Sequence, residues 1–593
     1  MFADGFAPGR LDVQPGLAVR DAREALRSLL AKVPQIDDRL RSRARGDAAT
    51  YPNWPELLGD DLSEWLDALE AASDGEQILV GTSMGGFAGG AAIESLLAVS
   101  LVLRGARPHA LLCDKVLPAC QLCEVANYPR IGHFIEHGPL VDRCSPCFTP
   151  AEAMYQGLTI PLHRYSENLA EADRQLARDI ARSTDVAEVG DFSFEGLHLG
   201  EHALAGALRF FARATIDSEE HGAAVVRRYL EAAVLTALAA RTLVRREGFS
   251  AAVLNHGIYV PQGLLAEVCR QEGVRVVTWN PAYRKQCFIF SHGDSYHHTM
   301  LDEPTSNWDQ MEWTSAMEAD ILQYLASRAH GKDDWIWFHD EPVSDLKALE
   351  LATGVDLSLP TIGLLTNVMW DAQLHYPANA FPNMLDWIVK SVDYFSRRKD
   401  LQLVVRVHPA ELRGSVKTRQ PVVDELRKHF PTLPSNVTVV GPESQVSTYA
   451  LTAQCDAVLI YGTKTGIELT SQGIPVIVAG EAWVRNKGIT LDAKSEGHYF
   501  ELLDQLPFAS RLDEMQTRRS RMYAYHFFFR KMVPITQAVP AAGNPPYTIE
   551  LAGIDELRPG ASPGLDVVCE GILGGAEFIF PAEVARAASQ SIA

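Results

Sequence analysis

Short apolar runs of strand length alternate with helical patterns through most of the chain. In the first half such runs lie at residues 77–81, 109–113, 251–255 and 274–278. In the second half they recur at residues 361–366, 401–407, 437–440, 457–461 and 475–479. Apolar runs of this length, bounded by Gly, Pro and polar residues, are typical of buried strands. Their alternation with helices predicts βαβ units and two doubly wound α/β domains.

Helical periodicity fills the intervals between these runs. We predict helices at residues 91–104, 232–246 and 518–532, and a largely helical block over residues 151–248. Residues 1–74 also have a helical pattern, which we interpret as an accessory cap. Its two apolar stripes are Leu17, Val19, Ala22, Leu26, Leu29 and Leu30, then Trp54, Leu57, Leu62, Trp65 and Leu69. Between the first two strands of the second half, a helix face is formed by Leu385, Ile388, Val392 and Phe395.

The turn after the strand at 457–461 is the first candidate site. Residues 461–466 would lie at the carboxyl end of a strand and the amino end of a helix, where free N–H groups favour a bound phosphate. Thr463 and Thr465 add hydroxyl donors, and Glu468, one turn into the helix, would reach a ribose hydroxyl. The alternative is an ordinary helix cap with a solvent-facing Glu468.

A second strand ends in polar residues at the same edge of the predicted sheet. The strand at 401–407 delivers Arg406, His408 and Glu411 to that edge. The first strand of this domain is followed by Asn367 and Asp371, which we also expect in the cleft. Several strands ending in polar groups favour a binding site over independent caps.

Two motifs in these strands resemble those of a known superfamily. Arg-Val-His-Pro-Ala-Glu at 406–411, followed by Tyr-Gly-Thr-Lys-Thr-Gly-Ile-Glu at 461–468, resembles the GT-B glycosyltransferases of bacterial capsule and surface-polysaccharide assembly, including Kdo-transferase-like and sialyltransferase-like enzymes. The resemblance covers residues 360–500. In those families an HP motif and a Ser/Thr-rich motif hold the nucleotide-sugar donor.

The resemblance implies a GT-B-like fold, in which two Rossmann-like domains face one cleft. From this resemblance, together with the pattern of elements along the chain, we predict an N-terminal helical segment (1–74), an acceptor-side domain (75–355) with a cysteine insertion (113–150) and a helical block (151–248), a nucleotide-sugar-binding domain (356–510), and a crossing helix and tail (511–593). We expect no catalytic metal, because Lys464, Arg406 and the helix end can supply the positive charge. The implied donor-binding residues are Arg406, His408, Glu411, Gly462, Thr463, Lys464, Thr465, Gly466 and Glu468.

The acceptor side is predicted from two loops of the first domain. Gly85, Gly86 and Gly89 follow a strand, in a loop that lacks the spacing of a dinucleotide fingerprint or a P-loop. We expect this loop to face the acceptor, the alternative being a tight turn packed under the next helix. His256 and Asp294 are the predicted general bases and, with His408, the predicted catalytic residues. The alternative for these His-rich loops is packing, and His292, His297 and His298 rank lower as bases.

Two cysteine pairs form a further motif. Cys120 and Cys123 are separated by 20 residues from Cys144 and Cys147, a spacing found in four-thiolate metal sites. We predict a structural zinc ion here. An iron–sulfur cluster and free or redox-active thiols are the alternatives, and His133 or His137 could replace one thiolate.

Charge and hydropathy limit the partners. A formal net charge of −21 argues against nucleic acid as the main partner. The first 30 residues have no apolar signal-peptide core, and the apolar run at 96–103 is too short to cross a bilayer. We therefore expect a soluble cytoplasmic protein with peripheral association with the inner membrane. We assign no role to the Pro- and Gly-rich tail that begins at residue 539.

We conclude from the sequence that the chain transfers a sugar from a nucleotide-activated donor to a glycan or other hydroxyl acceptor in bacterial surface-polysaccharide biosynthesis. Two alternatives keep the fold: a CDP-alcohol phosphotransferase and a sugar-nucleotide epimerase. A third alternative is a non-catalytic assembly protein.

Overall fold

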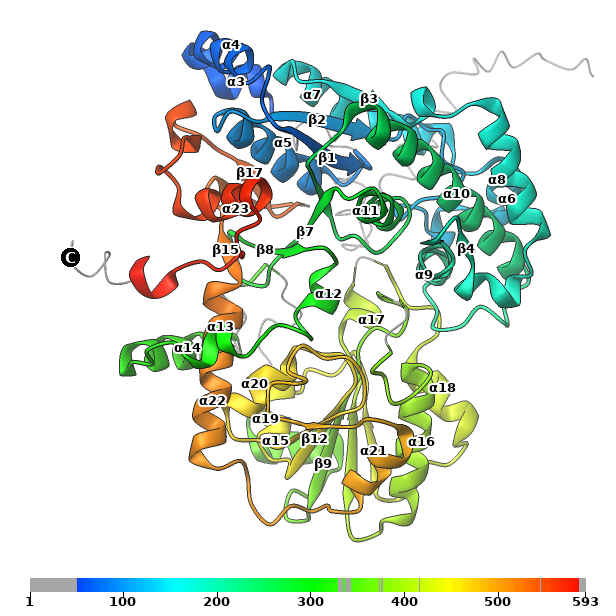
Figure 1. Cartoon of the computed structure of the whole chain (residues 1–593). Coiled ribbons are helices and arrows are strands. Elements are labelled where there is room, and N and C mark those ends of the chain that lie inside the picture. Colours follow the sequence, from blue (N-terminus) through cyan, green and yellow to red (C-terminus); the bar gives the residue numbers. More distant parts are fainter. Residues whose placement is uncertain are drawn as a thin grey trace, which may run out of the picture.

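Two α/β domains lie one above the other in this protein (Figure 1). The structure, a computed structural model, describes residues 51–328, 334–335, 343–372, 374, 377–414, 416–543 and 545–585. The first predicted helical stripe, from Leu17 to Leu30, lies outside the described residues. The second stripe forms α3 (Trp54–Leu58) and α4 (Leu62–Ala71), which bury Trp54, Leu58 and Trp65.

The first domain is built on a seven-stranded sheet in the order β15-β8-β7-β6-β1-β2-β3. The strands from β7 to β3 are parallel, whereas β8 is antiparallel to both of its neighbours. Strand β1 pairs with β2 on one side and with β6 on the other, so the strand order reverses between β1 and β6, which makes a topological switch point. The bounds are β1 (Gln77–Ser83), β2 (Arg107–Leu112), β3 (Leu162–Arg164), β6 (Ala251–Asn255), β7 (Arg275–Pro281), β8 (Cys287–His292) and β15 (Met532–Pro534).

Helices cover both faces of this sheet. On one face α5 (Ala88–Val102) is buried along almost its whole length, because it is apolar on all sides. On the other face α10 (Gly222–Glu247) packs its Ala, Leu and Val side chains with those of α9 and α11. The remaining elements are α6 (Ile131–His137), α7 (Val141–Leu158), α8 (Glu171–Ser183), α9 (Gly200–Phe211), α11 (Gln262–Gln271) and a small hairpin of β4 (Ser193–Phe194) and β5 (Leu197–His198).

The second domain is built on a six-stranded sheet that is parallel throughout, in the order β11-β10-β9-β12-β13-β14. This is the doubly wound order, with its switch point between β9 and β12. The strands are β9 (Thr361–Leu365), β10 (Gln402–Arg406), β11 (Val437–Val440), β12 (Ala457–Ile460), β13 (Val476–Val478) and β14 (Leu491–Asp492). The helices are α15 (Leu346–Thr353), α16 (Met384–Arg397), α17 (Ala410–Arg413), α18 (Val422–His429), α19 (Thr448–Thr452), α20 (Thr465–Ser471) and α21 (Glu496–Leu503).

The end of the chain returns from the second domain to the first (Figure 1). The long helix α22 (Glu514–Tyr525) continues as a π-helix (His526–Arg530), after which β15 joins the first sheet. The aromatic cluster of this helix is buried against Trp308 and Trp483. Beyond it lie β16 (Ala538–Pro540), β17 (Tyr547–Ile549) and α23 (Pro563–Gly574), and between the domains lie α12 (Tyr296–Thr299), α13 (Ser306–Asp309) and α14 (Ser315–Arg328).

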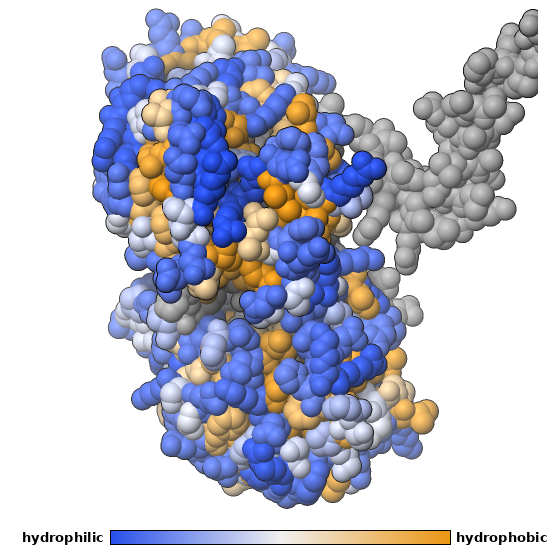
Figure 2. Space-filling model, turned by 90° about the vertical axis from the view of Figure 1, so that its right-hand side faces the viewer, coloured by the Kyte–Doolittle hydropathy of each residue, from blue (hydrophilic) through white to orange (hydrophobic). Residues whose placement is uncertain are grey.

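The structure confirms the predicted fold class, two Rossmann-like domains facing a cleft. On the face drawn in Figure 2, hydrophilic residues predominate and one group of hydrophobic residues lies near the junction of the two domains. Within the described ranges, no helix combines the length and apolar character needed to cross a bilayer.

Candidate functional site

A cavity of about 910 Å³ lies between the two domains. Its floor is formed by residues that follow β9, β10 and β12, because the carboxyl ends of parallel strands meet at one edge of a sheet. This edge contains the switch point of the second domain, where α/β proteins commonly bind ligands. The predicted positions Asn367, Asp371, Arg406, His408 and the turn 462–465 all line this cavity.

His408 is held as a neutral hydrogen-bond donor. The N–H of Ala410 donates to His408 Nδ1 at 3.1 Å, so the ring proton of the neutral form is on Nε2. Burial, with the charges of Lys464 and Arg406, lowers the pKa of His408 to about 4. The backbone N–H of His408 donates to Thr366 Oγ1 at 3.1 Å, which fixes the residue at the end of β10. The imidazole is therefore uncharged at neutral pH.

The turn after β12 supplies further donors. Asn367 Nδ2 donates to the carbonyl of Gly462 at 3.1 Å, which ties the turn to the end of β9. Thr463 Oγ1 lies 3.1 Å from Thr465 Oγ1 and accepts a hydrogen bond from Thr465 N at 3.3 Å. Gly466 is buried behind the lining, where an added Cβ would lie 2.6 Å from Ile460 Cδ1. Glycine at position 466 therefore serves packing.

Glu468 holds Lys464 in place. Its Oε1 lies 2.6 Å from Lys464 Nζ and 3.2 Å from Nε of Arg328, the last residue of the interdomain helix α14. Although burial opposes ionisation, the two cations hold the pKa of Glu468 at about 2. Glu468 is 1% exposed and is not one of the described residues that line the cavity. The ribose contact predicted for Glu468 is therefore not supported, because its carboxylate is engaged in these ion pairs.

Arg406 and Glu411, both predicted as donor ligands, have structural partners. Arg406 donates to the carbonyls of Gly441 at 2.5 Å and Ser444 at 3.2 Å, so it organises the loop after β11 while lining the cavity. Glu411 is 1% exposed and accepts a hydrogen bond from Val422 N at 3.3 Å. Burial raises the pKa of Glu411 to about 7.

The first domain contributes an aromatic and imidazole wall. His256 lines the cavity at the end of β6, in a left-handed backbone conformation with φ +63°. Its ring lies 5.6 Å from that of His297, which in turn lies 5.6 Å from the ring of Trp483. Tyr283 and Tyr296 complete this wall. The sequence ranked His297 below Asp294, but it is His297 that the fold brings to the cleft.

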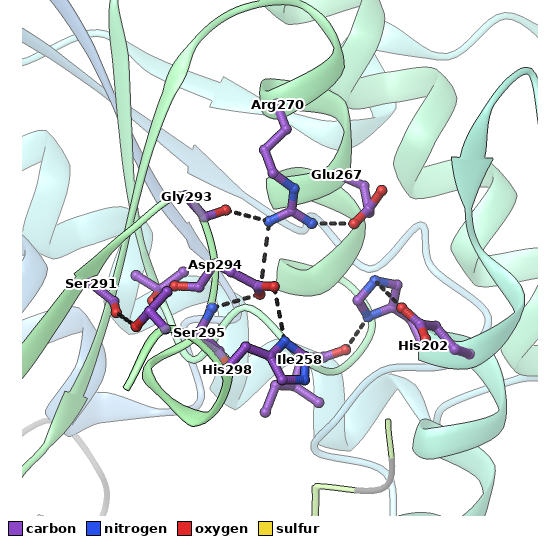
Figure 3. A network of polar contacts seen from close by, with 12 residues as sticks. His202, Ile258, Glu267, Arg270, Ser291, Gly293, Asp294, Ser295 and His298 are labelled. Carbon is purple, nitrogen blue, oxygen red and sulfur yellow. Dashed lines mark hydrogen bonds and ion pairs between the residues drawn. The ribbon is translucent and has the colours of Figure 1, made fainter. Parts of the chain in front are cut away.

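Asp294 lies outside the cavity, and its predicted role as a base is a correction. Figure 3 shows its carboxylate directed at His298 and Arg270. The distance from Asp294 Oδ2 to His298 Nδ1 is 2.9 Å, and Oδ1 accepts a hydrogen bond from Ser295 N at 2.6 Å. His292 is likewise directed away, with Nε2 2.8 Å from the carbonyl of Ala576. These residues stabilise a loop beside the cleft.

The glycine loop predicted to face the acceptor packs against other segments of the first domain, with Gly85 and Gly89 buried and Gly86 exposed. An added Cβ on Gly85 would lie 2.1 Å from the carbonyl of Cys147, and one on Gly89 would lie 2.7 Å from Pro545 Cβ. Gly86 N donates to Cys147 Sγ at 3.0 Å. These contacts favour the alternative interpretation, a packed turn, since the glycines permit close contact with α7 and with the segment around Pro545.

The four predicted zinc ligands lie on two segments that approach one another. Cys120 Sγ and Cys123 Sγ are 3.8 Å apart, while Cys144 and Cys147 lie one turn apart on α7. Over the described ranges, the only group of three or more His, Cys, Asp or Glu ligand atoms within 4.8 Å of one another is His109, His163 and Glu247. The four sulfurs are thus not gathered around one point. Burial raises the pKa of Cys144 to about 12 and that of Cys147 to about 11.

Together, the two doubly wound domains, the interdomain cavity and the polar ends of β9, β10 and β12 define a GT-B-like arrangement. Residues 364–510 match the family described as capsule polysaccharide biosynthesis protein. The matched range contains both the 406–411 and the 461–468 motifs, so the match confirms the predicted resemblance to proteins of capsule polysaccharide biosynthesis. No curated protein matches the chain.

Several solved structures are similar to the chain at low identity. Thermosulfurimonas dismutans KpsC, a beta Kdo 2,4 transferase, has 12% identity, 46% coverage of this chain and 80% of its own, and a TM-score of 0.31. Sucrose-phosphate synthase from Thermosynechococcus elongatus has 13% identity, 76% and 95% coverage, and a TM-score of 0.27. Neisseria meningitidis UDP-GlcNAc 2-epimerase has 8% identity, 75% and 98% coverage, and a TM-score of 0.26. Similarities this low do not define a shared activity.

Proposed function

We propose that the protein is a glycosyltransferase that moves a sugar from a nucleotide-activated donor to a hydroxyl of a glycan or other acceptor in surface-polysaccharide biosynthesis. The observation that carries this proposal is one cavity in which His408 and the turn 462–465 of the second domain face His256 of the first. A transfer between two substrates needs donor and acceptor held on opposite sides of one cleft, and this cavity offers both sides.

The donor phosphate would bind at the end of β12. Thr463 and Thr465 would supply hydroxyl and backbone donors, His408 Nε2–H a neutral donor, and Lys464 a positive charge. Charge builds on the leaving phosphate oxygen as the glycosidic bond breaks. Donors that are already in place stabilise this transition state more than the ground state. Glu468 and Arg406 then act by holding Lys464 and the 441–448 loop rather than by touching the donor.

The acceptor would lie against the first domain. His256 is the cavity-lining imidazole there that we assign as general base, while His297 and Tyr296 form the adjoining wall. Burial lowers the pKa of His256 to about 4, so its ring is neutral and able to accept a proton at neutral pH. No metal ion enters this scheme, since the phosphate charge is met by Lys464 and the hydrogen-bond donors.

A product assay tests this function. The protein would be incubated with CMP-, CDP-, UDP- and GDP-sugars, CDP-polyols and glycan acceptors, and the products analysed by mass spectrometry. Transfer by the wild type, with a loss of about 10²-fold or more in His256→Gln, is the expected result. Release of CMP with transfer of a phosphopolyol would instead identify the phosphotransferase, and a changed sugar nucleotide without acceptor would identify an epimerase. No turnover of any donor would favour the assembly protein.

We also propose a structural zinc ion at Cys120, Cys123, Cys144 and Cys147. The 3.8 Å between the first two sulfurs is about the separation expected for two thiolates on one tetrahedral zinc ion. Bound metal would draw the two pairs together. Elemental analysis of protein purified without added metal tests this: one zinc per chain, lost in Cys144→Ser and kept in the control Cys455→Ser, is expected. Absence of zinc from the wild type would contradict it.

The proposed reaction takes place in the cytoplasm, with peripheral association with the inner membrane, as the resemblance to capsule enzymes implies. Cell fractionation tests this location. The protein should divide between the cytoplasmic and inner-membrane fractions and leave the membrane at high salt. Recovery from the periplasm would contradict it.

A further inference from the structure

Tyr259 of the first domain is hydrogen-bonded to the second domain across the cleft. Its hydroxyl donates to Asp371 Oδ1 at 2.9 Å and accepts a hydrogen bond from Ala372 N at 2.7 Å. Tyr259 is 1% exposed. Asp371 follows β9 and lines the cavity. The position of this carboxylate is therefore set by a residue of the opposite domain.

Tyr259 also contacts His256, which lies three residues earlier in the same loop. The two rings are 5.4 Å apart. The loop is held firmly: His256 N donates to the carbonyl of Trp279 at 2.9 Å, and His202 is hydrogen-bonded to the carbonyl of Ile258 (Figure 3). A left-handed conformation is rare for a non-glycine residue, and such conformations concentrate at functional sites. The backbone of this loop therefore directs the imidazole of His256 into the cleft.

The imidazole of His256 has an unused polar atom. Its Nδ1 is buried and makes no hydrogen bond with any residue that the structure describes. A buried polar atom without a partner is costly, so such an atom at a cavity wall indicates a group that a ligand is to meet. His256 and Asp371 line the same cavity, and both contact Tyr259.

The groups around His256 act on the pKa of its imidazole, and Asp371 is one of them. The groups facing the ring are Asp371, Arg209, His297 and Tyr259. Burial lowers the pKa of His256, Asp371 raises it, and Arg209 lowers it. Asp371 is thus the negative charge that favours the protonated ring. The charge it supplies would matter most when His256 has accepted a proton.

We propose that His256 and Asp371 form an acid–base couple that is assembled across the cleft, with Tyr259 as its positioning residue. This inference rests on the proposed glycosyl transfer. The acceptor hydroxyl would give its proton to the ring of His256, while its oxygen bonds to the anomeric carbon. The bond from that carbon to the donor phosphate oxygen would break, and its electron pair would stay on the phosphate. Asp371 would stabilise the resulting imidazolium.

The couple predicts a distinct behaviour for each of three variants. Asp371→Asn should lower kcat by about 10²-fold or more while leaving nucleotide binding unchanged, because it acts on the proton transfer alone. Tyr259→Phe should lower kcat by about 10-fold, since the carboxylate remains but loses the hydrogen bond from Tyr259. Asp294→Asn is the matched control, a carboxylate near the cleft that lies outside the cavity, and it should keep wild-type kcat.

Two measurements on these variants test the proposal. The first is kcat against pH: the acid-side limb should move to lower pH in Asp371→Asn, because loss of the carboxylate lowers the pKa of His256. The second is an NMR titration of ¹³C-histidine-labelled protein, with His256 assigned from His256→Gln, in which the same decrease should be seen. An unchanged His256 pKa together with a kcat within about 3-fold of wild type in Asp371→Asn would overturn the proposal.

The two failures are distinguishable. If the wild type transfers no sugar from any donor, the proposed function is wrong, and the NMR titration still tests the electrostatic pairing of His256 with Asp371. If the wild type transfers sugar but Asp371→Asn behaves like Asp294→Asn, only the couple is wrong.

Discussion

Lys464 and Glu468 lie one helical turn apart, with 2.6 Å between Nζ and Oε1, and Glu468 is also ion-paired with Arg328 of the interdomain helix α14. Lys464 Nζ lies 4.6 Å from the centre of the Tyr283 ring in the first domain. The turn that would hold the donor phosphate is therefore fixed by an ion pair with the interdomain helix and by an aromatic ring of the first domain. Its positive charge is placed in advance of binding, as electrostatic catalysis requires.

The Glu468 ion pairs predict a large loss of stability on substitution. Glu468→Ala leaves the buried Lys464 without its carboxylate and the buried Arg328 with Asp334 alone, which should cost about 3–5 kcal/mol of unfolding free energy. The control is Glu496→Ala, which removes the exposed pair of Glu496 with Lys390 and should cost about 1 kcal/mol or less. Chemical denaturation of both variants measures this difference. Equal losses would contradict the assignment of Glu468 to a buried network.

Glu411 predicts a pH dependence of stability. Its pKa is about 7 in the folded protein, above the ordinary 4.5, because burial disfavours the carboxylate. The folded state therefore binds the proton more tightly, and the contribution of Glu411 is full below pH 4.5 and is lost as pH rises through 7. Glu411→Gln should remove this loss and gain about 1–3 kcal/mol relative to wild type between pH 5 and pH 8.

Denaturation curves at pH 5 and pH 8 for both proteins test this prediction. A constant difference between wild type and Glu411→Gln at the two pH values would show that Glu411 does not titrate there.

The glycine loop predicts a steric effect. Gly85→Ala would place a Cβ 2.1 Å from the carbonyl of Cys147 and 2.5 Å from Ala151 Cβ, so β1 and α7 would have to separate. We expect a loss of about 2 kcal/mol or more, seen as a lower Tm. Gly132→Ala is the matched control: it lies in α6 with nothing within 4 Å of the added Cβ, and alanine favours the helix. A Tm for Gly85→Ala as high as that of Gly132→Ala would be inconsistent with the contact.

His408 and Asp294 were both predicted as catalytic residues, but only His408 lines the cavity. His408→Ala removes a neutral donor from the cavity and should lower kcat/KM by about 10²–10³-fold. Asp294→Asn should leave kcat/KM within about 3-fold of wild type, because its carboxylate is directed at His298 and Arg270. Steady-state kinetics on the two variants tests both. A similar loss of kcat/KM in both variants would show that Asp294 belongs to the site.

Most strands could be predicted from the sequence, because the buried strands are continuous apolar runs. Residues 251–255 and 437–440 were predicted with the bounds that β6 and β11 have. In contrast, β15 has three residues, too few for any period, and its pairing with β8 joins segments far apart in the chain. The run that forms β8 was interpreted as part of a His-rich loop, because no local signal marks an antiparallel strand at this position.

The candidate site was predictable where it depends on strand ends, and not where it depends on tertiary partners. His408 and Thr463 follow strands, so the parallel sheet itself brings them together. Glu468 was assigned to a ribose because its partner Arg328 lies on a distant helix, which no spacing reveals. Asp294 and His297 lie three residues apart, and only the fold shows which of them faces the cavity.

The donor site is tested most directly by a thermal-shift measurement with CMP, CDP, UDP and GDP on wild type, Thr463→Val and the control Thr490→Val, which lies outside the cavity. Ligand that binds only the folded state at about 100 times its Kd adds about 2.7 kcal/mol of stability. The account predicts that one nucleotide raises the Tm of wild type and Thr490→Val, and that Thr463→Val loses most of this rise. No rise with any nucleotide at millimolar concentration, or an equal rise in all three proteins, would contradict a donor site at the end of β12.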